Sequence, residues 1–186
     1  EDIDGEAVAN SEYLYIEGFL VTSETGRAAA IKARDVAQSN DTKVAISLSD
    51  PGIVEHFKSG LQEMIGPGID LLFCNKQEAL TWCETDDLDS AIATMQKTAR
   101  QFVITLGAEG AIIFDGFSVL KAEGQAVTAV DTNGAGDMFA GAYLYGISQG
   151  QTCLEAATFA NRAASAVVGQ YSPRLHSAEY NGLKIS

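Results

Sequence analysis

Short apolar runs with strand composition alternate along this chain with segments of helical periodicity, and this alternation constrains the fold more than any other feature. Strands joined through helices run parallel, because each helix carries the chain back to the same end of the sheet. The sequence therefore predicts an α/β fold, with a mostly parallel sheet and helices on both faces. The expected strands are 13–20, 43–48, 69–74, 102–106 and 111–114, with weaker candidates at 117–122 and 126–130, and the expected helices are 23–38, one opened by Asp50 and Pro51, 76–83, 88–99, 135–148 and 153–168.

Length and charge limit the classes of protein to consider. The 186 residues are 46% hydrophobic, and no linker, repeat or low-complexity tract divides them, so we expect one α/β domain over residues 1–186. The formal net charge is −13 and no Lys/Arg cluster occurs, so neither nucleic acid nor an anionic membrane is an expected partner. No apolar stretch approaches the length of a membrane span, and no secretory leader is seen.

Cysteine and histidine usage indicates a cytoplasmic protein without a metal cluster. Cys74, Cys83 and Cys153 are odd in number and lack CxxC spacing, so we expect packed thiols in a reducing compartment. His56 and His176 are the only histidines, and we expect both to be surface or packing residues. The sequence has no GxxxxGK[ST], no GxGxxG in its first βαβ unit and no GxSxG, which argues against a P-loop kinase, a dinucleotide dehydrogenase and a triad hydrolase.

The segment from Asp131 to Asp137 reads Asp-Thr-Asn-Gly-Ala-Gly-Asp and lies between an apolar run and a helical pattern. Its two glycines remove side chains from a helix entrance, where successive N–H groups attract a phosphate. A first-turn carboxylate can simply complement the helix dipole, but that role needs neither the glycines nor Asp131. The functional interpretation uses every part. The amides of Ala135, Gly136 and Asp137 stabilise charge on a phosphoryl group, and Asp137 aligns a hydroxyl and accepts its proton.

Two further stretches follow expected strands, and each has a structural explanation beside a functional one. Asn75 with Glu78 three residues later is a helix-capping pattern, although an amide and a carboxylate there could also hold waters around a magnesium–phosphate complex. The loop from Thr105 to Gly110 is either a glycine turn between strands or a bare backbone on which a nucleotide lies. Ligands of parallel sheets gather at the carboxyl ends of strands, which makes both stretches candidates.

Residues 131–142, Asp-Thr-Asn-Gly-Ala-Gly-Asp-Met-Phe-Ala-Gly-Ala, resemble in full the C-terminal signature of the ribokinase-like (PfkB) sugar and nucleoside kinases. Asn75 with Glu78, the 105–110 loop and Phe159-Ala160-Asn161 fall in the order typical of that family, so the resemblance covers nearly the whole chain. It is closer to the adenosine-kinase-like and sugar-kinase members than to the vitamin kinases. It implies a three-layer α/β/α fold and ATP-dependent phosphoryl transfer to a hydroxymethyl or other alcohol group.

The resemblance also implies a role for each candidate residue. ATP lies on the 105–110 loop with Asn161 near its base or ribose, although Asn161 could equally face solvent as an ordinary polar helix residue. Asn75 and Glu78 hold the network of Mg²⁺, its waters and the phosphates. K⁺ or another monovalent cation is held by Asp131, the Asn133 backbone and the loop from Val168 to Pro173, where Tyr171-Ser172-Pro173 departs from the usual family wording. The predicted catalytic residues are Gly134, Ala135, Gly136 and Asp137; the predicted nucleotide contacts are Asn75, Thr105, Leu106, Gly107, Ala108, Glu109, Gly110 and Asn161; the predicted metal contacts are Glu78, Asp131 and Asn133.

One departure from the family is the lack of an N-terminal half with the acceptor motif, the first strands and a β lid. We therefore expect the nucleotide-binding C-terminal part of a kinase, with little activity alone. An uncovered sheet edge would favour a homodimer or association with an N-terminal segment. The acceptor stays open among adenosine, other nucleosides, ribose and fructose. A nucleotide-binding module or inactive fragment acting through a partner stays open as the non-enzyme alternative.

Overall fold

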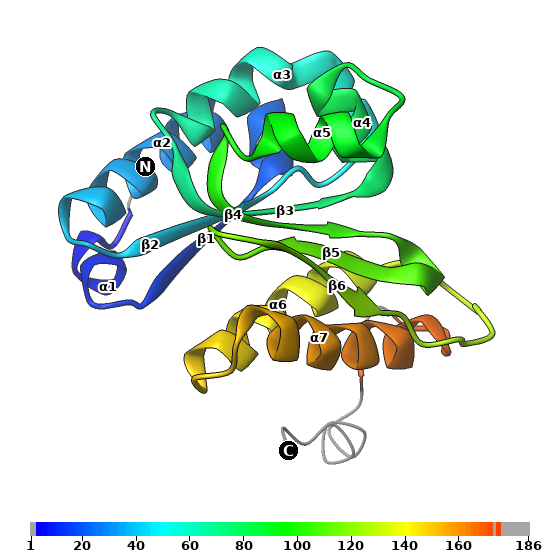
Figure 1. Cartoon of the computed structure of the whole chain (residues 1–186). Helices are drawn as coiled ribbons and strands as arrows, with labels where there is room; N and C mark the ends of the chain where they lie inside the picture. Colours follow the sequence, from blue (N-terminus) through cyan, green and yellow to red (C-terminus); the bar gives the residue numbers. More distant parts are fainter. Residues whose placement is uncertain (1–2, 173, 176–186) are drawn as a thin grey trace. The chain divides into compact units, whose positions relative to one another are not determined.

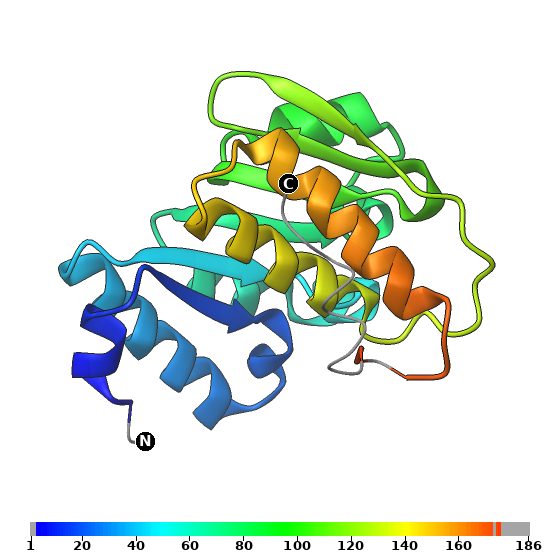
Figure 2. The same ribbon diagram turned by 90° about the horizontal axis from the view of Figure 1, so that it is seen from below.

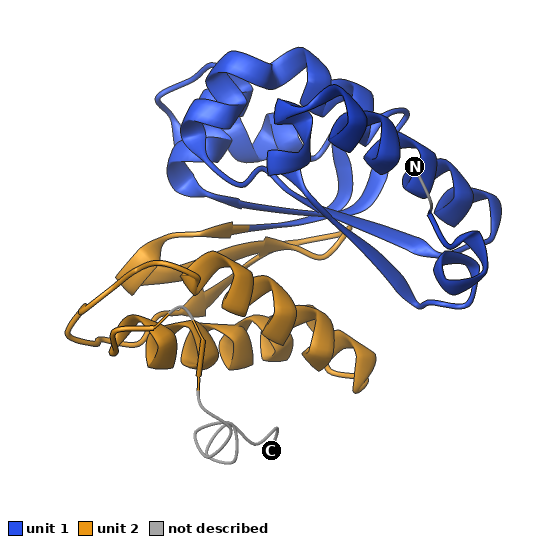
Figure 3. Ribbon diagram, turned by 180° about the vertical axis from the view of Figure 1, so that it is seen from behind, with its two compact units in different colours: residues 1–103 blue, residues 104–186 orange. Residues whose placement is uncertain are grey.

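The computed structural model describes residues 3–172, 174 and 175, and its strands form one six-stranded mixed sheet in the order β1-β2-β3-β4-β5-β6. The chain divides into two compact units, residues 1–103 and 104–186 (Figure 3). The single domain expected over 1–186 stays a prediction beside this division. Pro173 of the expected cation loop and His176 lie outside the described residues.

Unit 1 consists of parallel strands that alternate with helices, as the sequence predicts. Its elements are α1 (Gly5–Ala9), β1 (Tyr13–Glu17), the 3₁₀ helix η1 (Gly18–Thr22), α2 (Glu24–Ser39), β2 (Lys43–Ser47), α3 (Pro51–Ile65), β3 (Ile69–Asn75), α4 (Lys76–Cys83), α5 (Leu88–Met95) and the first residues of β4 (Ala99–Thr105). The strand β2 pairs in parallel with both β1 and β3. The helices α3, α4 and α5 lie on one side of β2 and β3 (Figure 1). Apolar strand residues such as Ile46 and Leu72 are fully buried beneath helices, which explains why their runs lack polar alternation.

Side-chain caps set the helix starts of unit 1. Asp50 accepts a hydrogen bond of 2.8 Å from the Gly52 amide, and Pro51 occupies the first turn of α3. Ser23 accepts a hydrogen bond of 3.0 Å from the Gly26 amide at the start of α2. Each cap satisfies an amide that the helix itself leaves unpaired. The predicted starts of both helices are therefore confirmed within one residue.

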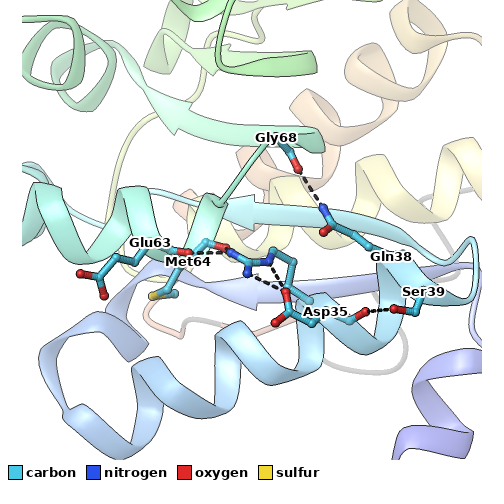
Figure 4. A network of polar contacts seen from close by, with 7 residues as sticks. Asp35, Gln38, Ser39, Glu63, Met64 and Gly68 are labelled. Atoms are coloured by element: carbon cyan, nitrogen blue, oxygen red, sulfur yellow. Dashed lines mark hydrogen bonds and ion pairs between the residues drawn. The ribbon is translucent and has the colours of Figure 1, made fainter.

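The buried Arg34 of α2 bonds to the end of α3, at the residues Glu63 and Met64 labelled in Figure 4. The Nη1 atom of Arg34 donates to the carbonyl oxygens of Glu63 at 2.6 Å and Met64 at 2.9 Å. Carbonyls in the last turn of a helix have no partner within it, so the guanidinium supplies what the helix lacks. The Asp35 carboxylate accepts from Nε and Nη2 of Arg34 and balances its charge. This cluster fixes the connection from α3 to β3.

Unit 2 consists of a hairpin and two packed helices. Its elements are the end of β4, the 3₁₀ helix η2 (Gly107–Glu109), β5 (Gly110–Phe114), β6 (Val119–Glu123), α6 (Ala135–Ser148) and α7 (Cys153–Val168). The strands β5 and β6 pair antiparallel, and α6 and α7 run side by side (Figure 2). Thr152 and Glu155 form the expected capping box of α7. The chain leaves α6 through Gly150, whose φ of 82° is in the left-handed region that glycine favours.

Two predicted elements are too long, and one predicted strand is absent. The 13–20 strand ends at Glu17, because the chain turns into η1, where the Phe19 amide donates to Ser49 Oγ at 3.1 Å. The 88–99 helix ends at Met95, and β4 already begins at Ala99. The 126–130 segment is no strand. Its residues are exposed, and the Val130 amide donates to the carbonyl of Val168 at the end of α7 instead of to a neighbouring strand.

Candidate functional site

The start of α6 carries no side-chain cap from any described residue. Gly134 occupies the position before the helix with φ 77°, a left-handed conformation that explains this glycine structurally. The Ala135 amide donates to the Thr132 carbonyl at 3.3 Å. The amides of Gly136 and Asp137 donate to no other group in the part of the chain that the structure describes. Two N–H groups at the positive end of the helix dipole are therefore available to a ligand.

Gly136 has no structural reason to be glycine. It lies within α6 at helical dihedrals, where glycine is less stable than alanine, and a Cβ added there would meet no atom within 4 Å. The absence of a side chain keeps the backbone of this turn open from outside. Asp137 follows in the same turn and is exposed. Its carboxylate thus stands at the rim of an accessible helix start.

A cavity of about 290 Å³ lies within unit 2, and the start of α6 forms part of its wall. The other walls come from the β4–β5 loop, the segment after β6 and one face of α7. Most of the contributing side chains are small or apolar, which suits a flat aromatic ligand more than a highly charged one. The lining residues are Thr105, Gly107, Ala108, Gly110, Gln125, Val127, Ala129, Thr132, Ala135, Gly136, Phe139, Asn161, Ala164, Ser165 and Val168.

The β4–β5 loop supplies bare backbone to this cavity. Gly107 (φ 62°) and Gly110 (φ 96°) are both in conformations that side chains rarely adopt. A Cβ on Gly110 would also lie 2.1 Å from the Ala122 carbonyl oxygen, and one on Gly124 would lie 2.1 Å from that of Ala108. The structural explanation for these glycines is therefore sufficient by itself. Gly107, Ala108 and Gly110 of this loop nevertheless line the cavity, so the loop presents little side chain to it.

Asn161 is buried in the middle of α7, with 7% of its surface exposed. Its Nδ2 atom donates to the carbonyl oxygens of Glu123 at 3.1 Å and Ala122 at 3.4 Å, both at the end of β6. The alternative of a polar helix residue facing solvent is therefore wrong. The side chain lines the cavity, but the structure has already committed its amide protons to the backbone.

The segment expected to bind a monovalent cation forms part of the same unit. Asp131 Oδ1 accepts from the Asn133 amide at 3.0 Å, a local turn that precedes α6. The amides of Val130 and Asp131 both donate to the Val168 carbonyl, at 2.9 and 3.3 Å. The structure thus brings together the start of the glycine motif and the end of α7, as the cation hypothesis requires.

The Asn75–Glu78 pair belongs to unit 1 and forms a capping box at the start of α4. The Asn75 side chain accepts from the Glu78 amide at 2.9 Å, and Glu78 Oε2 accepts from the Asn75 amide at 2.9 Å. The two side chains also bond to each other, from Asn75 Nδ2 to Glu78 Oε1. Burial raises the pKa of Glu78, the hydrogen bond from the Asn75 backbone opposes that rise, and the Asp50 charge adds to it. Helix capping therefore explains both residues by itself. Any ligand here would meet a carboxylate that already accepts hydrogen bonds from Asn75.

The structure brings part of the predicted set into one place. Seven predicted residues line the cavity: Thr105, Gly107, Ala108, Gly110, Ala135, Gly136 and Asn161. Leu106, Glu109, Asp131, Asn133, Gly134 and Asp137 lie in the same unit without lining it, whereas Asn75 and Glu78 lie in unit 1. Sequence reasoning assigned no nucleotide-contact role to seven other lining residues, of which Val127 and Ala129 were expected in a strand: Gln125, Val127, Ala129, Thr132, Phe139, Ala164 and Ser165. Val168, which also lines the cavity, was given a role only in the cation loop.

Other candidate chemistry is weak in the described residues. His56 is exposed on α3, and no disulfide joins the three cysteines, of which Cys74 is buried. Within residues 3–172, 174 and 175, no three His, Cys, Asp or Glu side chains group as metal ligands would. The same ranges contain no helix long and apolar enough to cross a membrane. The uncapped helix start with its cavity is therefore the best candidate site.

A family model described as pfkB family carbohydrate kinase matches residues 1–179. The chain belongs to the pfkB family. This finding confirms the resemblance carried by residues 131–142. It also accounts for the observed sheet with its helices, because solved members of the fold superpose closely on this pfkB-family chain.

Individual relatives include nucleoside and sugar kinases. Adenosine kinase 1 of Arabidopsis thaliana is 31% identical over 172 residues, which cover 83% of this chain and 49% of that kinase. The structure of adenosine kinase from Sinorhizobium meliloti matches with a TM-score of 0.91 and 30% identity, over 97% of this chain and 57% of that one. A probable sugar kinase from Rhizobium etli CFN 42 matches with a TM-score of 0.91 and 28% identity, over 98% of this chain and 58% of that one. The chain spans about half the length of the curated relatives it matches.

Proposed function

We propose that this chain is the ATP-binding part of a kinase that transfers the terminal phosphoryl group of ATP to an alcohol group of a nucleoside or sugar. One observation carries the proposal. The start of α6 is uncapped by any described side chain, has a glycine that the fold does not require, and opens on a cavity with small and apolar walls. A helix start of this kind binds phosphate, and an adjoining apolar cavity suits a nucleotide base.

The amides of Gly136 and Asp137 are the main donors to the transferring phosphoryl group. The Ala135 amide was expected to join them, but it already donates to Thr132, so its contribution requires that bond to open or to be shared. N–H groups fixed in a helix need no reorientation as negative charge develops on the phosphoryl oxygens. They therefore stabilise the transition state more than a mobile side chain would.

Asp137 aligns the acceptor hydroxyl and receives its proton. It is exposed at the rim of the site, where an acceptor can reach it. A carboxylate is a weak base for an alcohol, but phosphoryl transfer passes through a loose transition state in which proton transfer can come late. Alignment is then the larger part of its role, and proton acceptance the smaller part.

The cations expected for this chemistry have plausible ligands in each unit. Glu78 is a bonded, buried carboxylate whose pKa is raised by burial and by the charge of Asp50, so a nearby cation would relieve its unfavourable charge. It fits a role in holding waters of the Mg²⁺ shell, since Mg²⁺ retains several waters in proteins. Mg²⁺ would neutralise phosphate charge. For K⁺, the Asp131 carboxylate and the Asn133 carbonyl are the oxygen ligands that fit, because the Val168 carbonyl oxygen already accepts from the amides of Val130 and Asp131.

The acceptor is a nucleoside such as adenosine, or a sugar. The relatives named adenosine kinases support the nucleoside, and the match to a probable sugar kinase supports the alternative. We expect little turnover by the 186 residues alone, because they cover about half the length of their curated relatives, and the resemblance implies that acceptor contacts and a lid lie in the remainder. In unit 1, Phe19, Leu20 and Phe57 are exposed, which supports association with a further segment or with a second copy. If neither the 186 residues alone nor the chain joined to a further segment shows turnover, the alternative of a nucleotide-binding module remains.

The test of the proposal is Asp137→Asn in a chain joined to the part of its relatives' length that these 186 residues do not cover. We expect turnover to fall by roughly a thousandfold or more with ATP affinity intact, because the variant keeps the amides but loses the proton acceptor. The matched control is Asp89→Asn, since Asp89 is also a first-turn aspartate, in α5, and does not line the cavity. Unchanged turnover in Asp137→Asn would exclude it as the base.

A further inference from the structure

Among the residues that the structure describes, Asn161 is the one buried amide side chain that lines the cavity. A carboxamide has two N–H donors on its nitrogen. The Nδ2 atom of Asn161 uses them on two successive carbonyls, of Ala122 and Glu123. In a site that excludes water, breaking such bonds to contact a ligand would leave backbone acceptors unpaired.

The two carbonyls lie at the end of β6, just before Gln125, the first residue after this strand that lines the cavity. Directly after them, Gly124 crosses Gly110 so closely that a Cβ on Gly110 would lie 2.5 Å from the Gly124 nitrogen. Gly110 and Ala108, which sit on the other side of this crossing, both line the cavity. Through Ala122 and Glu123, the side chain of Asn161 therefore ties α7 to the crossing of the two loops.

We infer that Asn161 is a positioning residue: it holds the cavity wall in place through the end of β6, and its amide protons do not read the nucleotide base. This inference rests on the proposed function. The base is then selected by the shape of a largely apolar cavity, whose nearby side chains include Val127, Phe139, Ala164 and Val168. The phosphates are held separately at the start of α6. Loss of Asn161 should therefore weaken the binding of different purine nucleotides by the same factor and leave the phosphate contacts intact.

The test is the isosteric variant Asn161→Asp, which has the same size but cannot donate to the two carbonyls when ionised. Calorimetric titration of the chain with MgATP, MgGTP and inorganic tripolyphosphate separates the cavity from the phosphate site. We expect roughly tenfold weaker binding of ATP and GTP, an unchanged ratio between the two, and unchanged tripolyphosphate affinity. Asn40→Asp is the matched control, because Asn40 also donates its amide to a backbone carbonyl, that of Val36, outside the cavity.

Hydrogen exchange of the segment 119–124 tests the positioning role independently of any ligand. Faster exchange in Asn161→Asp than in wild type supports the inference. If the wild-type chain binds no nucleotide, that finding refutes the proposed function, but faster exchange in the variant still supports the positioning role. A changed ATP-to-GTP ratio would overturn the inference, since it would mean that Asn161 reads the base. An equal loss of tripolyphosphate binding would also overturn it. If Asn161→Asp does not fold, Asn161→Ser, which keeps one donor, should show the same pattern with a smaller loss.

Discussion

Gly110 and Gly124 pass each other with no room for a side chain on either residue: a Cβ on one would lie 2.5 Å from the backbone nitrogen of the other. The crossing joins the β4–β5 loop, which lines the cavity, to the end of β6. Close backbone approach is the physical reason for glycine at these two positions.

Replacing either glycine with alanine should therefore destabilise the protein strongly. In Gly110→Ala and Gly124→Ala the new Cβ meets a carbonyl oxygen at 2.1 Å, so the backbones must separate. We expect a loss of about 3 kcal/mol or more in the free energy of unfolding, from urea denaturation. The control is Gly107→Ala, where φ is 62° but the space is open, and the expected cost is about 1–2 kcal/mol. Equal losses in the free energy of unfolding of all three variants would contradict the close approach of the backbones at Gly110 and Gly124.

Arg34 should contribute far more to stability than an exposed arginine. Arg34→Met keeps the apolar stem but leaves the carbonyls of Glu63 and Met64 without their donor, which should cost roughly 2–3 kcal/mol. Arg100→Met is the matched control, since the Arg100 side chain is 84% exposed in its ion pair with Asp70. An exposed pair contributes about 1 kcal/mol at most. If thermal or urea unfolding shows the same loss of stability in both variants, the claim that Arg34 stabilises the contact between α2 and α3 is refuted.

Two capping-box glutamates should respond to pH in opposite directions. Burial raises the pKa of Glu78, so the folded state binds this proton more tightly than the unfolded state does. Its stabilising contribution is fully present below the unfolded pKa and is lost as pH rises through the folded pKa. Hydrogen bonds from Thr152 lower the pKa of Glu155, so its contribution is present above the unfolded pKa and is lost as pH falls.

The measurement is the stability of Glu78→Gln and Glu155→Gln relative to wild type between about pH 4 and pH 8, a range that spans the unfolded pKa of glutamate. Relative to wild type, Glu78→Gln should become more favourable as pH rises, and Glu155→Gln less favourable. The two residues hold the same position in their capping boxes, so local geometry is matched. Parallel slopes for the two variants would contradict the difference in burial.

Helix ends and the glycine motif could be predicted because their signals are local. The sequence predicts α4, α6 and α7 with the bounds that the structure has, since Asn75–Glu78 and Thr152–Glu155 are capping pairs only three residues apart. The start of α6 needs no distant contact either. Gly134 adopts a left-handed conformation, and the helix follows at once.

The cavity wall could not be predicted in the same way. Residues such as Val127 and Ala129 have the apolar spacing of a strand, but no strand pairs with them, and they line the cavity instead. The partners of Asn161 are 38 and 39 residues away along the chain, so no local pattern shows that its amide is committed to β6. Both features depend on tertiary contacts between segments far apart in the chain, and no local sequence pattern indicates such contacts.

The most direct test of the phosphate site compares two glycines of α6. Gly136 and Gly141 both lie inside the helix, and a Cβ on either would meet no atom within 4 Å. Alanine at either position should leave stability unchanged or raise it by up to about 1 kcal/mol, because glycine is a poor helix residue. Only at 136 would the methyl group stand among the amides that face the phosphate. Calorimetric titration with MgATP should show roughly tenfold or greater weakening for Gly136→Ala and wild-type affinity for Gly141→Ala. A Gly136→Ala protein that folds normally and binds ATP as tightly as wild type would contradict the account.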